Sequence, residues 1–210
     1  MRQILFLTAV LYAQALDRGQ VIDRIAVTVG KTVITEGEVL TNLKVAAFLD
    51  DKEPDLSGPS KRKAADRLVE QVLLRREVPA SGEVRDTSAL IADLKKRYAS
   101  QAEYEAALKH YEITEQDVID QIANGLESLD ASNRRFRAEV QVTEDEIRSR
   151  YDTFVKHGQE KNSGTVPSFE ASHNQVQELL MDEGVSEALV KWLQQARSQG
   201  SIVYREAVFK

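Results

Sequence analysis

The chain has 210 residues, of which 42% are hydrophobic and 30% charged, a balance typical of a folded globular protein rather than a disordered one. Its 28 basic and 34 acidic residues give a formal charge of −6, which argues against a uniformly basic nucleic-acid-binding protein. The absence of cysteine excludes disulfide bonds, thiolate zinc sites, a catalytic cysteine and lipid attachment at a cysteine.

The first fifteen residues have the features of an export signal. Met1 and Arg2 form a short positive region, and residues 4–12 are apolar but too few to span a bilayer, which needs about 20 residues. Residues 13–15 then supply the small residues of a cleavage site. We predict cleavage after Ala15 and a mature chain in the periplasm, where disulfides are allowed but not required. The alternative is a buried N-terminal helix or strand.

A β-hairpin is predicted at the start of the mature chain. Residues 21–29 are rich in β-branched residues, residues 30–31 form a tight turn, and residues 32–34 continue as a second strand. An isolated hairpin is marginally stable in water, so we expect a strand or a helix to cover it. Thr35 and Glu38 have the spacing of a capping box and predict that a helix follows at once.

Amphipathic helices are predicted throughout the middle of the chain. Residues 61–78 form a long helix with an apolar side, and residues 89–98 form a shorter one. Gly125 lies inside a later helix, where it costs about 1 kcal/mol relative to alanine, so we expect a bend or close packing there. Three further helix starts carry a serine or threonine followed three residues later by an acidic residue. These starts are Ser100, Thr114 and Thr143.

The C-terminal part is predicted to be one long helix and a strand. A polar linker precedes the helix, which Ser168 caps and Gly200 ends, and residues 201–208 form a strand that we expect to pair with the hairpin. The fold is therefore mainly α, a helical array with a small N-terminal β-hairpin joined by a C-terminal strand. The predicted units are a signal peptide (1–15), a helical domain with the hairpin (16–156), a linker (157–167) and a C-terminal helix and strand (168–210).

Motifs of common catalytic sites are missing from the sequence. There is no glycine-rich phosphate loop, no G-x-S-x-G and no H-E-x-x-H, and the three histidines lack the spacing of metal ligands. We interpret the basic runs at 61–63 and 133–135, and the acidic run at 144–146, as charged helix surfaces. The sequence therefore predicts no cofactor, no metal and no nucleic-acid partner.

Several segments resemble the SurA family of periplasmic chaperones. Residues 27–39 (VTVGKTVITEGEV) are similar to the family's opening pattern V-V-N-x-x-x-I-T-x-x-E-V, with Gly30 where the family usually has asparagine. Residues 65–74 resemble the family's L-I-x-x-x-L-L helix. Residues 113–118 and 142–147 are similar to its two recurrent V-T/S-x-x-E/D-I helix starts.

The C-terminal segments extend this resemblance over nearly all of the mature chain. Residues 168–193 and 202–204 resemble the helix and strand that follow the family's parvulin-type prolyl isomerase domain. In this chain only thirteen residues separate Val155 from Phe169, too few for such a domain. The resemblance thus implies a SurA-like core without the isomerase domain. No catalytic residue of the family has a counterpart here, so we predict that the protein is not an enzyme.

The resemblance implies an ATP-independent chaperone, a holdase, that binds unfolded outer-membrane or exported proteins in the periplasm. The mature chain would have no integral membrane segment. One alternative is an adaptor that binds a single folded partner, and a less favoured one is a prolyl isomerase. Aromatic and aliphatic side chains are the candidates for lining a peptide groove, although half-buried packing between helices is the alternative for the tyrosines. These candidates are Leu43, Phe48, Leu49, Tyr98, Tyr104 and Tyr111.

Overall fold

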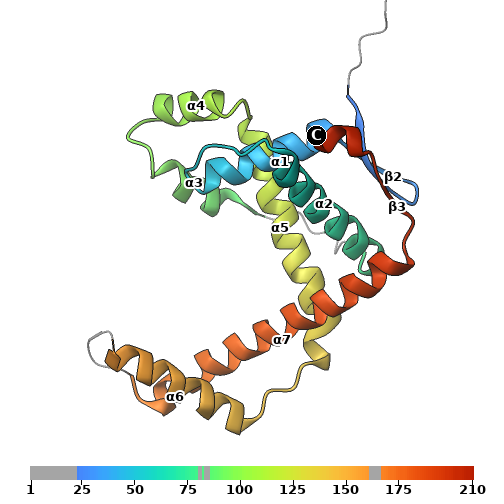
Figure 1. The fold of residues 1–210 in the computed structure, drawn as a ribbon. Coiled ribbons are helices and arrows are strands. Elements are labelled where there is room, and N and C mark those ends of the chain that lie inside the picture. Colours follow the sequence, from blue (N-terminus) through green and yellow to red (C-terminus); the bar gives the residue numbers. More distant parts are fainter. Residues whose placement is uncertain (1–22, 80–81, 83–85, 161–166) are drawn as a thin grey trace, which may run out of the picture.

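A computed structural model describes residues 23–79, 82, 86–160 and 167–210, with no description of the side chains of 157–160. The predicted signal peptide lies outside the described residues. In the described part, helices dominate and a three-stranded sheet joins the two ends of the chain, which confirms the mainly α fold class (Figure 1). The helices are α1 (Glu36–Leu49), α2 (Gly58–Glu77), α3 (Ser88–Lys95), α4 (Gln101–His110), α5 (Glu115–Phe136), α6 (Glu144–Glu160) and α7 (Phe169–Gln199).

The sheet confirms the predicted pairing of the two ends. Strands β1 (Ile25–Val29) and β2 (Thr32–Thr35) form the hairpin, and β3 (Ile202–Tyr204) pairs antiparallel with the other side of β1. Strand β3 is shorter than the predicted 201–208. After β3 the chain forms a 3-10 helix, η2 (Glu206–Phe209). This helix places Val208 in the core, where its burial stabilises the turn away from the strand direction.

Local capping explains where several helices begin. Thr35 with Glu38 and Thr114 with Asp117 form reciprocal capping boxes, as predicted. At Ser100 the box is incomplete, because the Glu103 carboxylate accepts a hydrogen bond from the N–H of Ala99 instead. Helix α6 continues to Glu160, four residues into the segment predicted as linker.

The predicted close packing at Gly125 is wrong. A Cβ atom there would meet nothing within 4 Å, because this glycine faces solvent on α5, which runs unbroken from Glu115 to Phe136. Close packing occurs at Gly184 in α7, where a Cβ atom would overlap the side chain of Val140. It also occurs at Gly58, where a Cβ atom would overlap the backbone of Phe209.

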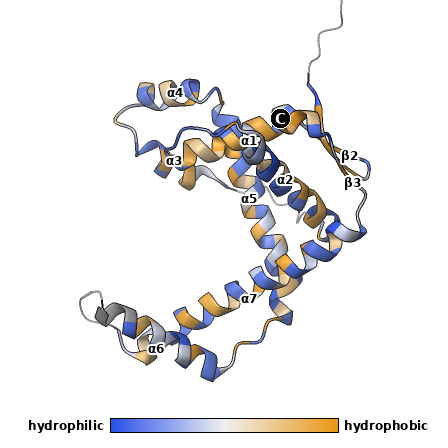
Figure 2. Ribbon diagram, in the orientation of Figure 1, coloured by the Kyte–Doolittle hydropathy of each residue, from blue (hydrophilic) through white to orange (hydrophobic). Residues whose placement is uncertain are grey.

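The elements form three regions, the body, the lobe and the arm (Figure 1). The body comprises the sheet, η2, α2 and the C-terminal half of α7. The lobe comprises α1, α3, α4 and the start of α5, and the arm comprises α6 folded against the N-terminal half of α7. Helix α5 runs from the lobe to α7, so it connects all three regions. Figure 2 shows hydrophobic and hydrophilic residues alternating along α5 and α7, as expected of amphipathic helices with one face packed.

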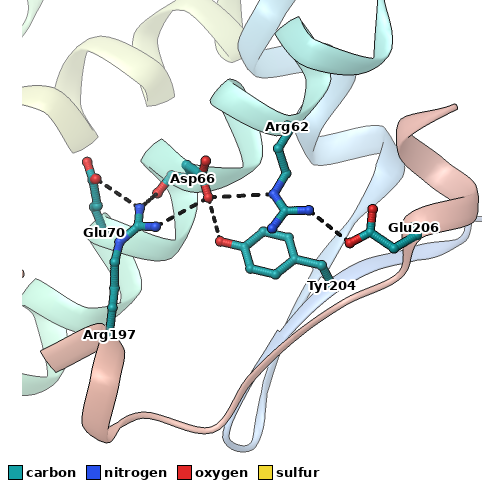
Figure 3. A network of polar contacts seen from close by, with 6 residues as sticks. All are labelled: Arg62, Asp66, Glu70, Arg197, Tyr204 and Glu206. Atoms are coloured by element: carbon teal, nitrogen blue, oxygen red, sulfur yellow. Dashed lines mark hydrogen bonds and ion pairs between the residues drawn. The ribbon is translucent and has the colours of Figure 1, made fainter. Parts of the chain in front are cut away.

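A polar network fixes the C-terminal segment on α2 (Figure 3). The Tyr204 hydroxyl donates to the Asp66 carboxylate at 2.5 Å, and the Arg197 guanidinium donates to Glu70 at 2.9 Å. The Arg62 guanidinium lies 3.5 Å from the centroid of the Tyr204 ring and pairs with Glu206 at 2.9 Å. The basic run at 61–63 is therefore not a uniformly solvated surface, because Arg62 helps to close the chain's two ends together.

Candidate peptide-binding groove

The aromatic residues predicted to line a groove form the core of the lobe. Phe48 stacks on Tyr98 with ring centroids 6.1 Å apart, and Tyr98 meets Tyr104 edge-on at 5.5 Å. Tyr111 lies edge-on to Phe48 at 5.4 Å. Leu49 packs against the same cluster. Phe48 and Tyr104 are buried, so this is the packing between helices that the sequence left as the alternative.

The sixth candidate, Leu43, lies apart from the other five. It packs against the body core beside the hairpin rather than against the lobe core. Leu43 and Phe48 are five residues apart on α1, about 140° around the helix, so they face different cores. The sequence did not reveal this separation, because α1 carries apolar residues on more than one side.

Among the described residues, one buried side-chain polar atom has no hydrogen-bond partner, and it lies in the lobe core. The Tyr104 hydroxyl is buried and has no hydrogen-bond partner among the described residues. Burial away from water raises the pKa of this hydroxyl to about 12, and the nearby Glu115 carboxylate acts in the same direction. The lobe core therefore carries the cost of a buried polar group.

An open apolar groove lies elsewhere, where α2, α5 and α7 converge. This three-helix groove has a volume of about 360 Å³. Its floor is made of Leu74 from α2 and of Val185, Leu189 and Leu193 from α7, which follow one another at intervals of four residues and so share one face of the helix. Leu129 of α5 lies at its edge and is 59% exposed.

The exposed lining of the groove is largely apolar, with the amides of Gln71 and Asn133 as its uncharged polar groups besides three hydroxyls. Three serines line it, and each hydroxyl already donates to the backbone carbonyl four residues earlier in its own helix. Its charged groups lie on α2 and α7, where Arg67 donates to Asn42 and Glu70 accepts from Arg197. Contacts in this groove would thus be largely non-directional, which suits ligands of varied sequence. The serines are Ser128, Ser132 and Ser186.

The arm extends the apolar path beyond the groove. Leu179, three residues before Asp182 at the groove wall and on the same face of α7, is exposed. The arm is held near the groove by Arg137, which pairs with Glu178 at 2.5 Å and with Asp182 at 3.2 Å.

The groove residues Leu129, Leu189 and Leu193 lie on amphipathic helices, and no motif sets them apart in the sequence. Composition alone cannot distinguish such a residue from one that fills a core.

No group of three or more histidine, aspartate and glutamate side chains in the described residues is placed to hold a metal ion. No helix in the described ranges combines the length and apolar character needed to cross a bilayer.

Comparison with known proteins gives no assignment. No protein-family model matches the chain, and a search of curated proteins finds no relative. The SurA resemblance therefore stays a prediction from the residues.

Proposed function

We propose that the mature chain is an ATP-independent periplasmic chaperone that holds unfolded outer-membrane or exported polypeptides. The observation that carries this proposal is the three-helix groove, in which an apolar floor of Leu74, Val185 and Leu193 is bordered by the exposed Leu129. Exposed apolar residues beside a groove are typical of protein-binding surfaces.

Weak and reversible binding is what such a groove would supply. Burying apolar surface contributes about 25 cal/mol per Å², so a segment that covers 150 to 200 Å² gains about 4 to 5 kcal/mol before the entropy of ordering is subtracted. A protein that binds unfolded chains in this way lowers the concentration available for aggregation and needs no nucleotide.

The proposal is tested by light scattering of a urea-unfolded outer-membrane barrel protein diluted into buffer with residues 16–210. The unmodified chain should lower scattering in a dose-dependent way at near-stoichiometric ratios. Leu129→Asp places a charge at the groove and should require several-fold more protein for the same suppression. Leu90→Asp is the matched control, because Leu90 is a helical leucine with 46% exposure on α3 and does not line the groove.

Both variants alter exposed side chains, so each should keep the circular dichroism and thermal stability of the unmodified chain. Equal suppression by Leu129→Asp and by the unmodified chain would remove the groove from the proposal. No suppression by the folded, unmodified chain would overturn the holdase function and favour an adaptor with one dedicated partner.

A further inference from the structure

Strand β2 is an edge of the sheet, and its centre is open. The strand order β2-β1-β3 leaves β2 paired on one side only. Val29 pairs with Thr32 across the two-residue turn, so the next pair, Thr28 with Val33, does not exchange hydrogen bonds. The N–H and C=O of Val33 therefore point away from β1, and no group of the described residues bonds to them.

The two ends of this edge are closed by side chains. Arg76 of α2 donates to the Thr32 hydroxyl at 2.9 Å, and the Thr35 N–H donates to the Glu38 carboxylate at 2.6 Å. Between them Val33 is 45% exposed. The opening is therefore confined to the backbone N–H and C=O of one residue, Val33.

A cavity of about 440 Å³ lies against this edge and is distinct from the three-helix groove. All four residues of β2 line it, together with α1, α2 and α5. Leu68 and Val72 of α2 are half-buried against the body core and also line this cavity. An added strand would extend the sheet over α2, and its inward side chains would cover these two residues.

The walls of the cavity are negatively charged. Four carboxylates line it, and Arg75 is the one basic side chain that does so among the described residues. Asp120 on α5 is exposed, and its carboxylate accepts a hydrogen bond from the Gln116 amide at 2.8 Å. This charge favours a ligand that carries lysine or arginine. The carboxylates are Asp23, Glu38, Asp117 and Asp120.

We infer that this cavity binds a short extended peptide segment as a fourth strand beside β2, with apolar side chains over Leu68 and Val72 and basic side chains toward α5. The main chain of the ligand exchanges two hydrogen bonds with Val33, which gives recognition that does not depend on sequence. The inference deepens the proposed function and rests on it only for the class of ligand, an unfolded polypeptide.

The test is binding of a fluorescein-labelled heptapeptide of alternating valine and lysine, measured by fluorescence anisotropy with residues 16–210. Val33→Pro removes the outward N–H without removing a hydrogen bond to β1, and should weaken binding about tenfold or more. Val33→Thr keeps the N–H and the β-branched shape, and should bind within about twofold of the unmodified chain. A heptapeptide of alternating valine and glutamate should bind at least about tenfold more weakly.

A second measurement needs no variant. The Val33 amide should become protected from hydrogen exchange when the valine–lysine peptide is added, whereas the amide of Val203, already paired in the sheet, should not change. Unchanged exchange at Val33, or equal binding by Val33→Pro, would overturn the inference. Leu129→Asp should bind this peptide normally, so failure of the strand site and failure of the groove give different patterns in the two assays.

Discussion

The body and the lobe each contain a tyrosine whose pKa is raised to about 12. In both cases burial is the main cause. The two hydroxyls differ in hydrogen bonding, because one has a partner and the other has none among the described residues. Tyr204 in the body donates to the Asp66 carboxylate and so closes a network between α2 and the C-terminal strand. Tyr104 in the lobe has no partner among the described residues.

This difference shows how the two regions are specified. The body joins segments that are far apart in the sequence, and directional contacts set their register. The lobe core joins α1 to α3, α4 and α5 through apolar and aromatic packing, which has no fixed direction and does not require the Tyr104 hydroxyl to have a partner. We therefore expect that removing a single polar group from the body lowers the free energy of unfolding. Removing the unpaired hydroxyl from the lobe should leave the free energy of unfolding unchanged or raise it.

The largest effect is expected from deleting residues 201–210. This removes β3 together with Val208, which is 3% exposed, and with the half-buried Phe209. The free energy of unfolding should fall by about 4 kcal/mol, since two to three apolar side chains leave the body core. Urea denaturation followed by circular dichroism measures this change in the free energy of unfolding. Val203→Ser, at an exposed position in the same strand, is the control and should have a much smaller effect. Unchanged stability after the deletion would contradict the pairing of the two ends.

A smaller loss is expected from Tyr204→Phe. The substitution removes the donor to Asp66 and keeps the ring under Arg62, so the expected cost is about 1.5 kcal/mol. Urea denaturation should show this as a lower midpoint with an unchanged slope. Tyr151→Phe is the control in the arm, because its hydroxyl donates to the Pro167 carbonyl at an exposed site and should cost less.

Tyr104→Phe is expected to stabilise the protein, in contrast to Tyr204→Phe. Phenylalanine keeps the edge-on contact with Tyr98 and removes the buried hydroxyl, so the free energy of unfolding should rise by about 1 kcal/mol. The same denaturation experiment tests it beside Tyr204→Phe. A loss of stability would mean that the hydroxyl has a partner, for example a bound water.

The sequence predicted what depends on local chemistry. The capping box at Thr35, the hairpin turn and the amphipathic helices follow from short-range rules, and each was found. Predicting the pairing of β3 needed only the observation that an isolated hairpin requires a partner. The capping box, the turn and the helices are set by neighbours in the chain, whereas the pairing of β3 followed from the need to cover the hairpin.

The candidate site could not be predicted in the same way, because it depends on which helix faces meet. Phe48 and Leu129 are both apolar residues on amphipathic helices, yet the first is buried in the lobe and the second borders the open groove. The glycines of the helices give the same lesson. Gly125 and Gly184 both lie inside long helices, and only the tertiary packing of Val140 distinguishes them.

In the arm, a contact between a histidine and a carboxylate joins the two helices. His173 of α7 lies 2.9 Å from the Glu144 carboxylate of α6. The hydrogen bond to Glu144 is the main cause that raises the pKa of His173 above its usual 6.5, and the nearby Arg148 opposes this shift. The folded state therefore favours the protonated imidazole. Its contribution to stability is fully present below about pH 6.5 and is lost as the pH rises through the raised pKa.

The smallest expected effect is therefore a pH-dependent loosening of the arm. Amide hydrogen exchange in α6 should be slower in the unmodified chain than in His173→Gln at about pH 5.5, and the two should converge at about pH 9, once the intrinsic pH dependence of exchange is subtracted. Exchange in the body and the lobe should be the same in both proteins at either pH. If α6 were equally protected in the two proteins at low pH, the packing of Ile147 and the pair of Arg150 with Glu183 would be sufficient to hold the arm.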